Sequence, residues 1–271
     1  MIIIGEKING AIPKVAEAIK NRDGAYISNL AKEQETAGAD YLDVCAGTSP
    51  AEEYDALCWM IDVVQNSAAI PICIDSPDPR TLHKIFPKLL LPGLVNSVSM
   101  EGEKCEVLLP ILCDAPEWGV IALCCDNKGI ASSKEEKTRI AFSIIEKAAE
   151  YGISPDRMHI DPLVLSLPAV NDSALHFCEA AVEIKARYPE IKITAALSNI
   201  SYGMPARGVV NRSFLTLAMH AGLDSVIADP LNRDVIGAIY ATEALLGRDR
   251  LCRNYNKAYR NGKIGSAGNV L

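Results

Sequence analysis

The sequence has little aromatic content, no excess of positive charge and no long hydrophobic run, and each shortage excludes a class of partner. Aromatic residues make up only 6% of the 271 residues, which is too few for the stacking platforms that bind single-stranded nucleic acids. The formal net charge of −7 argues against a surface that binds nucleic acids or anionic membranes. No apolar stretch approaches the roughly 20 residues that a membrane-spanning helix needs. The sequence therefore predicts no nucleic-acid partner and no membrane partner.

Signals for secretion, disulfide bonds and metal binding are also missing. The N-terminal stretch MIIIGEKING lacks the basic start and long apolar segment of a signal peptide, so we expect a cytoplasmic protein. The nine cysteines form no CxxC pair and are scattered through apolar runs, which favours reduced, buried thiols. Only four histidines occur, without ligand partners at familiar spacing. A zinc site is therefore the weaker alternative, and no bound metal is expected.

Motifs of covalent and phosphate chemistry are absent as well. The sequence contains neither GxGxxG nor GxxxxGK[ST], the glycine-rich patterns that hold phosphates. It has no serine nucleophile elbow, no obvious catalytic Cys-His pair and no lysine at a predicted strand end that would form a Schiff base. These absences argue against covalent catalysis by the protein itself.

Short apolar runs alternate with longer amphipathic segments along the chain. The runs predict eight strands, at residues 2–4, 39–47, 70–75, 94–99, 119–126, 157–163, 191–199 and 224–230. The amphipathic segments predict helices at residues 25–37, 51–67, 77–89, 104–118, 132–152, 172–189, 211–222 and 232–247. The strands are apolar throughout rather than alternating, as in sheets covered on both faces.

Eight strand–helix units in this length of chain predict an α/β protein with a single-domain (β/α)8 TIM barrel over residues 1–247. A doubly wound open sheet is the alternative fold. Residues 248–271 fall outside the eight units and are basic and poor in apolar residues. They predict either a flexible tail or an arm that docks on a second subunit.

Polar residues stand in or just after the predicted strands, where barrels of this kind place their chemistry. Each has a structural alternative, since Asp43 suits a satisfied core polar group, Asp75 suits a helix cap, and Asp161 and Asp229 precede proline as turn residues do. Together they favour a polar pocket. Carboxylates and amides pair well with the N–H donors of a 2-amino-4-oxopyrimidine edge, as in guanine or a pterin. The residues concerned are Glu6, Asn9, Asp43, Asp75, Asn96, Ser97, Ser99, Asp126, Asn127, Asp161, Ser198, Asn199 and Asp229.

Several of these segments resemble a known family. The stretches GEKIN (5–9), IDSPDP (74–79), LVNSVS (94–99), IDPLV (160–164) and LSNISYGMPARGVVNRSF (197–214) are similar to those of the pterin-binding methyltransferases. Within that family the likeness is to the methyltetrahydrofolate:corrinoid/iron–sulfur protein methyltransferases, and it covers nearly the whole chain. Dihydropteroate synthases share the barrel, but their SDGG-type first loop and their late motifs with Lys and Arg are missing.

The resemblance implies an enzyme of anaerobic one-carbon metabolism that moves the N5-methyl group between 5-methyltetrahydrofolate and the cobalt of a cobamide. The cobamide would be carried by a separate corrinoid protein, because no DxHxxG motif is present. A homodimer is implied as well. Asp75, Asn96 and Asp161 would hold the pterin ring.

The remaining site residues follow from the same resemblance and from the chemistry at N5. Asn199 would be the catalytic residue, because its amide can reorient to stabilise protonated N5 although it is no acid. Asp43 or Ser198 would order the water that supplies the proton. Arg207 is expected in the loop nearer the corrinoid. The same corrinoid-facing loop carries Tyr202 and Met204. The direction of methyl transfer stays open, and so do two rivals, a dihydropteroate synthase-like enzyme and a non-catalytic pterin-binding or corrinoid-docking subunit.

Overall fold

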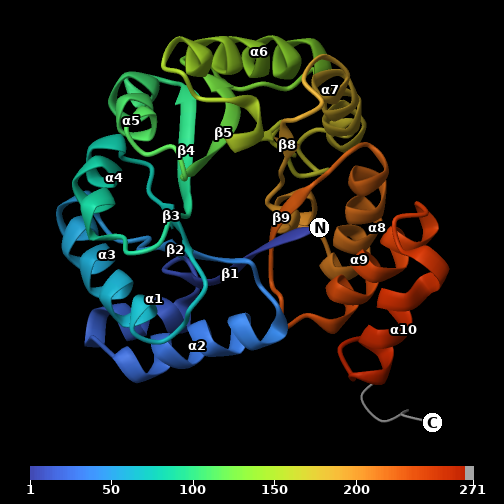
Figure 1. The fold of residues 1–271 in the computed structure, drawn as a ribbon, viewed down its shortest axis with the longest axis horizontal. Coiled ribbons are helices and arrows are strands. Elements are labelled where there is room, and N and C mark those ends of the chain that lie inside the picture. Colours follow the sequence, from blue (N-terminus) through green and yellow to red (C-terminus); the bar gives the residue numbers. More distant parts are fainter. Residues whose placement is uncertain (266–271) are drawn as a thin grey trace.

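The computed structural model describes residues 1–265 and shows a nearly closed barrel of parallel strands (Figure 1). In this part of the chain the strands run in the spatial order β8-β7-β5-β4-β3-β2-β1-β9. Two isolated parallel bridges, Ile193 to Leu223 and Ala196 to Ile227, link the two ends of that order. The parallel strands are β1 (Ile2–Asn9), β2 (Tyr41–Cys45), β3 (Ile72–Asp75), β4 (Leu94–Met100), β5 (Gly119–Asp126), β7 (Met158–Asp161), β8 (Lys192–Ile193) and β9 (Ser225–Ala228).

Helices follow the strands and surround the barrel, as Figure 1 shows. A short strand, β6 (Gly129–Ile130), pairs antiparallel with β5 at its end. None of the helices in residues 1–265 combines the length and apolarity that a membrane crossing needs. The helices are α1 (Pro13–Asn21), α2 (Gly24–Ala37), α3 (Pro50–Gln65), α4 (Pro79–Ile85), α5 (Lys104–Cys113), α6 (Lys134–Glu150), α7 (Ser173–Arg187), α8 (Arg207–His220), α9 (Arg233–Leu245) and α10 (Arg253–Arg260), with 3-10 turns at Phe86–Lys88, Pro155–Arg157, Leu197–Ser201 and Arg250–Cys252.

Two separate apolar clusters explain why the strands are apolar on both faces. The larger cluster fills the space between the strands and the helices. The smaller one consists of Ile4, Cys73, Leu94 and Ile121, which come from four strands and contact one another inside the barrel. Because successive strand residues point to opposite faces, alternate positions supply the two clusters. The predicted (β/α)8 barrel is therefore confirmed.

The predicted seventh strand is wrong in its extent. Only Lys192–Ile193 forms a ladder, and the chain from Leu197 to Ser201 is a 3-10 turn. The residues between stay beside their neighbours, since the Thr194 N–H donates to the Ile160 carbonyl at 2.8 Å. The apolar run indicates that the segment is buried, but a buried segment need not form the regular hydrogen bonds of a strand with its neighbours. Ser198 and Asn199 therefore lie on a turn rather than at the end of a strand.

Three further differences from the prediction concern helices α8, α1 and α4. Helix α8 begins at Arg207, four residues before the predicted start, so Arg207 is helical rather than part of a loop. Helix α1 was not predicted, although Pro13 opens it as proline often does at a helix start. The predicted single helix over residues 77–89 is α4 followed by the turn Phe86–Lys88, where Pro87 cannot continue α4.

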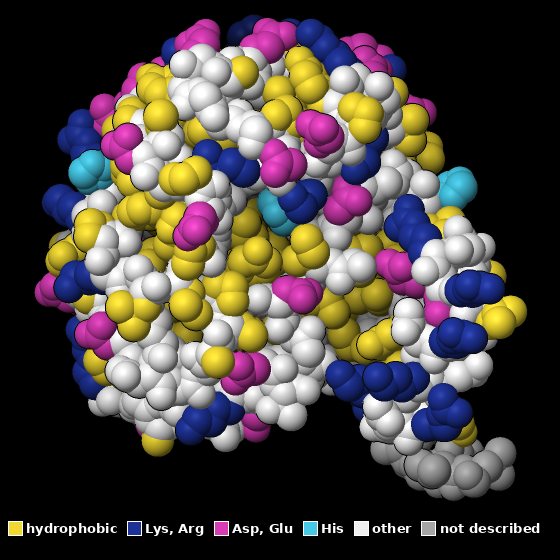
Figure 2. Space-filling view, viewed as in Figure 1, with side chains coloured by type: hydrophobic (Ala, Val, Ile, Leu, Met, Phe, Trp, Pro, Cys, Tyr) yellow, Lys and Arg dark blue, Asp and Glu magenta, His cyan; other side chains and the backbone are white. Residues whose placement is uncertain are grey.

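The basic segment after the barrel contains α10, which lies outside the ring of helices (Figure 1). It contacts α9, with Ala258 buried. Figure 2 shows its basic side chains gathered at the same corner of the molecule. Part of the predicted arm is thus a helix that packs on the chain's own barrel. Residues 266–271 of that arm lie outside the described residues.

Candidate functional site

A cavity of about 790 Å³ opens among the carboxyl ends of the barrel strands. The strand ends and the turns that follow them contribute nearly all of its lining. All eight residues predicted to bind a pterin line it, and so does Arg207. The predicted residues that line the cavity are Glu6, Asn9, Asp43, Asp75, Asn96, Ser97, Asp161, Ser198, Asn199 and Arg207.

Strands β2, β3 and β4 bring two carboxylates and an amide together. Asp75 is the register partner of Cys45 on β2 and of Asn96 on β4. Asn96 donates from its side-chain nitrogen to the Asp43 carboxylate at 3.4 Å. Because the strands are parallel and in this register, the three polar side chains emerge at one side of the cavity.

The two carboxylates of this group resist ionisation. Burial raises the pKa of Asp75 to about 6. The thiol of Cys45 donates a hydrogen bond to the Asp75 carboxylate, and this bond lowers the pKa in part. Burial also raises the pKa of Asp43 well above its ordinary value, and the negative charge of Asp75 adds to this. Asp43 in turn accepts from the thiol of Cys73, its register partner. Such acceptors are costly to bury without donors, and a ligand rich in N–H groups would supply them.

Asp161 ends β7 and faces the same cavity from the opposite arc of the barrel. Its carboxylate accepts from the backbone N–H of Leu163 at 2.7 Å. Burial raises its pKa to about 7, although this hydrogen bond and the charge of Lys137 both lower it. The residue is therefore poised between the carboxylate and the acid near neutral pH.

Strand β1 contributes Glu6, which is the third carboxyl with a pKa near neutrality. Burial raises this pKa to about 7, and the charge of Asp229 raises it further, while Lys7 and Arg207 lower it. Lys7 Nζ lies 3.2 Å from Asp229 Oδ2, so Asp229 serves as the partner of a lysine. Asn9 at the end of β1 uses its side-chain oxygen to accept from the Ala11 N–H at 2.9 Å.

Asn199 lies in the 3-10 turn that follows β8, and Arg207 holds that turn from the first residue of α8. The Arg207 guanidinium donates to the Ser198 carbonyl at 2.7 Å and to the Ser201 hydroxyl at 3.0 Å. Ser201 is fully buried, so this contact ties the guanidinium to a fixed point. Neither of these two hydrogen bonds from Arg207 involves the side-chain amide of Asn199. Asn199 lines the cavity.

Tyr202 and Met204 stand apart from the cavity lining. Tyr202 is 73% exposed, and both residues lie in the segment between the 3-10 turn and α8. Their predicted role toward a corrinoid therefore concerns the rim of the site.

Two lysines that were not predicted from the sequence, Lys7 and Lys104, also line the cavity. Lys7 was within the GEKIN stretch, but its register on β1 was not foreseen. Lys104, the first residue of α5, pairs with Glu101 at 3.0 Å and carries a charge that lowers the pKa of Asp75. Its position just after β4 is the signal that would have found it, because helix starts that follow strands lie at the mouth of such a barrel.

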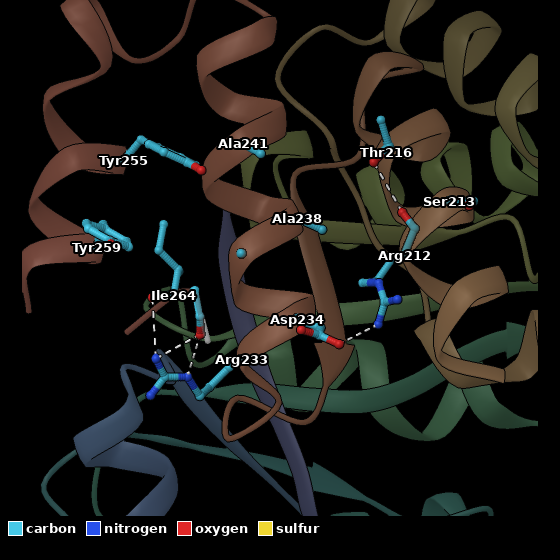
Figure 3. Close-up of a pocket in the computed structure, with 12 residues that line it drawn as sticks. Arg212, Ser213, Thr216, Arg233, Asp234, Ala238, Ala241, Tyr255, Tyr259 and Ile264 are labelled. Carbon is cyan, nitrogen blue, oxygen red and sulfur yellow. Dashed lines mark hydrogen bonds and ion pairs between the residues drawn. The ribbon is translucent and has the colours of Figure 1, made fainter. Parts of the chain in front are cut away.

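A second cavity of about 520 Å³ lies outside the barrel, among α8, α9 and α10 (Figure 3). There Arg212 pairs with Asp234 at 2.7 Å, and Arg233 donates to the carbonyls of Ile264 and Gly265. Its charged groups already have partners. None of the predicted site residues lines it, so the strand-end cavity is the candidate site.

The strand-end cavity offers hydrogen-bond acceptors to a planar ligand. Asp43, Asp75 and Asp161 present carboxyls, and Asn96 and Asn199 present groups that both donate and accept. Among the described residues 1–265, no group of three His, Cys, Asp or Glu side chains has the geometry to hold a metal ion.

A comparison with family models shows to which family the chain belongs. Residues 8–229 match the model described as pterin binding enzyme. The chain belongs to the pterin-binding enzymes. The matched stretch contains every predicted site residue except Glu6.

Curated relatives of this pterin-binding enzyme agree with the resemblance seen in its motifs. It is 52% identical over 266 residues to the methylcorrinoid:tetrahydrofolate methyltransferase of Eubacterium limosum, and the match covers 98% of each chain. It is 29% identical over 250 residues to the methionine synthase of Mycobacterium tuberculosis. That match covers 86% of this chain and 21% of the synthase. The predicted family is therefore confirmed.

Solved structures of dihydropteroate synthases share the fold. The enzyme from Xanthomonas albilineans, in complex with 7,8-dihydropteroate, has a TM-score of 0.67 at 17% identity, covering 90% of this chain and 92% of that chain. The Thermus thermophilus enzyme has a TM-score of 0.64 at 16% identity, covering 90% and 94%. At this identity the likeness concerns the barrel and carries no argument about activity.

Proposed function

We propose that this pterin-binding enzyme transfers a methyl group from a methylated corrinoid to N5 of tetrahydrofolate. The observation that carries the proposal is the 52% identity, over 98% of both chains, to a methylcorrinoid:tetrahydrofolate methyltransferase. The cavity is consistent with that activity, because its acceptors suit a pterin.

In this proposal the pterin edge binds between the two arcs of carboxyls. The Asp75 carboxylate accepts two N–H groups of the 2-amino-4-oxopyrimidine, and Asn96 donates to the ring oxygen. Asp161 binds the ring from the opposite arc. Supplying these donors to buried acceptors stabilises the complex by about 1.5–3 kcal/mol for each bond to a charged group.

The transfer itself moves one methyl cation and one proton. The N5 lone pair forms a bond to the methyl carbon, the cobalt–carbon bond breaks, and both of its electrons remain on the corrinoid as Co(I). The nitrogen becomes cationic and then loses its proton. Asn199 stabilises that cation by turning its amide oxygen toward the N5 proton, an interaction that is stronger in the transition state than in the ground state. The proton leaves through ordered water beside Ser198 and Asp43.

The remaining features of the proposal concern partners and location. The corrinoid arrives on a separate protein that docks on the rim where Tyr202 and Met204 lie, and Arg207 keeps the turn beneath that rim in place. We also propose a cytoplasmic homodimer that works in anaerobic metabolism. The name of the Eubacterium limosum relative favours the direction from corrinoid to folate.

A dihydropteroate synthase-like reaction is less well supported. That reaction needs a site for a pyrophosphate leaving group. The three cations that line the cavity already have partners within residues 1–265, because Lys7 pairs with Asp229, Lys104 with Glu101, and Arg207 donates to a backbone carbonyl.

Calorimetric titration with tetrahydrofolate tests the pterin site. We expect micromolar binding to the wild-type chain and no detectable binding to Asp75→Ala. Asp126→Ala is the matched control, because Asp126 ends β5 as Asp75 ends β3 but pairs with Arg139 outside the cavity. A folded wild-type protein that binds no folate contradicts the proposal.

A further inference from the structure

Lys137 on α6 is a fully buried lysine whose three ammonium protons are all engaged by backbone carbonyls. Its Nζ donates to the carbonyl oxygens of Ala131 at 2.7 Å, Pro162 at 2.8 Å and Leu163 at 2.7 Å. Its exposed fraction is 0%. Because an ammonium has three donors, this set leaves none unsatisfied.

A buried cation is an expensive way to fill space. Taking an ammonium out of water costs free energy that neutral carbonyls repay only in part, and an apolar side chain would pack there without that cost. Burial accordingly lowers the pKa of Lys137. The positions of the three carbonyls show which part of the structure the charged side chain of Lys137 holds in place.

Two of those carbonyls belong to the residues that directly follow Asp161. Leu163 turns its N–H back onto the Asp161 carboxylate at 2.7 Å and adopts a left-handed backbone conformation, with φ of 59°. A leucine rarely adopts that conformation without support from its surroundings. Lys137 supplies the support by holding the two peptide carbonyls that flank Leu163, those of Pro162 and of Leu163 itself.

The third carbonyl anchors this clamp to another part of the barrel mouth. Ala131 follows the β5–β6 hairpin, and its N–H donates to the Cys124 carbonyl on β5 at 3.4 Å. The lysine therefore joins the turn after β7 to β5. Leu163 itself lines the strand-end cavity, so movement of this turn would change the site directly.

We propose that Lys137 is a positioning residue for pterin binding, which holds the 162–163 turn and thereby aims the Asp161 carboxylate into the cavity. The inference rests on the proposed function, since it assumes that Asp161 binds the pterin. Lys137 does not line the cavity, so in this proposal it acts through Asp161 and not on the ligand directly.

The charge of Lys137 acts on Asp161 together with few other titratable groups. Cys124 faces both residues from β5, with a thiol whose pKa burial raises, and Glu136 acts on Lys137 from its own helix. The pKa of Asp161 is about 7 with the lysine in place, and the lysine lowers it. Removing the positive charge should therefore raise that pKa and move the pH at which the carboxylate forms upward.

The test measures the dissociation constant of tetrahydrofolate from pH 6 to pH 9 by calorimetry. Lys137→Met keeps the length of the side chain and removes its charge. We expect weaker binding at every pH and a midpoint of the pH dependence that is higher by about one unit or more. In an Asp161→Asn background the shift of the midpoint should vanish. The matched control is Lys134→Met, which removes a lysine of the same helix that pairs at the surface with Glu183 at 2.6 Å.

Each outcome bears on a different claim. Wild-type affinity with an unchanged midpoint in folded Lys137→Met overturns the inference and leaves the proposed function intact, whereas absent binding in the wild type overturns the proposed function. If Lys137→Met does not fold, Lys137→Gln gives the same reading with two donors kept. If neither folds, Lys137→Arg decides, because it retains the charge but not the three-carbonyl geometry. Weakened binding with the wild-type midpoint supports the inference, and wild-type affinity overturns it.

Discussion

Replacing Asp75 by asparagine should make the folate-free protein more stable at neutral and alkaline pH. Burial raises the pKa of Asp75 from 3.8 to about 6. A group whose pKa is raised on folding stabilises the folded state fully at pH values well below 3.8, and this contribution is lost as the pH rises through about 6. A shift of this size corresponds to about 3 kcal/mol, at about 1.4 kcal/mol for each pKa unit. Asparagine is neutral at every pH and avoids that loss.

Urea denaturation of the folate-free protein at pH 4, 6 and 8 measures this effect. The free energy of unfolding of Asp75→Asn, relative to wild type, should rise by about 2.5 kcal/mol between pH 4 and pH 8. The control is Asp126→Asn, because the pKa of partly buried Asp126 is lowered by the hydrogen bonds that it accepts from the Lys128 N–H and the Arg139 guanidinium. That variant should show no such rise.

The same substitution should weaken folate binding, since the variant loses the negative charge that two pterin N–H groups would contact. At about 1.5–3 kcal/mol for each charged hydrogen bond, the loss is on the order of 10²–10⁴-fold in affinity.

A pH-independent difference in the free energy of unfolding between Asp75→Asn and wild type would refute the reasoning about stability. It would mean that Asp75 ionises in the folded protein at the same acidic pH as in the unfolded chain.

Three further predictions concern the turn and the rim beside the cavity. Asn199→Ala should lower the rate of methyl transfer by about 10²–10³-fold with little change in the folate dissociation constant. The surface variant Asn29→Ala is the control and should keep the wild-type rate. A wild-type rate in Asn199→Ala would show that Asn199 takes no part in catalysis. Arg207→Met should slow transfer by roughly tenfold because it frees the Ser198 carbonyl. Arg212→Met is its control, because it removes an arginine of the same helix whose partner, Asp234, lies on α9 outside the site. Tyr202→Ala should raise the KM for the corrinoid protein and leave folate affinity unchanged, and a changed folate affinity would place Tyr202 in the pterin site instead.

The residues of the cavity could be found from the sequence because parallel strands of a barrel end at the same mouth. Asp75 and Asp161 each end an apolar run, and that position alone brings them to one cavity. No knowledge of strand register was needed. The roles assigned to these residues remain predictions.

The local structure around Asn199 and Arg207 could not be found in the same way. The apolar run before Asn199 is buried but leaves the ladder after Ile193, and hydrophobicity does not distinguish a paired strand from an irregular buried segment. Arg207 precedes the amphipathic part of α8, and its contacts with Ser198 and Ser201 are tertiary, so the hydrophobic pattern does not reveal them.

The buried lysine was missed for a related reason. Lys137 lies in a helix among charged residues, where a lysine usually faces solvent. Its burial depends on two carbonyls more than twenty residues away in the chain. Only the folded arrangement of α6 against the turn after β7 shows this.

The central claim is methyl transfer between a corrinoid and tetrahydrofolate, and anaerobic absorption spectroscopy tests it most directly. Methylcob(III)alamin is mixed with the purified chain, with and without tetrahydrofolate, and the conversion to Co(I) is followed alongside the formation of 5-methyltetrahydrofolate. The account predicts Co(I) and 5-methyltetrahydrofolate in equal amounts, only when both the enzyme and tetrahydrofolate are present, and at a rate that Asn199→Ala strongly reduces. Folate binding without any demethylation, also with methylated corrinoid proteins as donors, would contradict it and leave a pterin-binding or docking subunit.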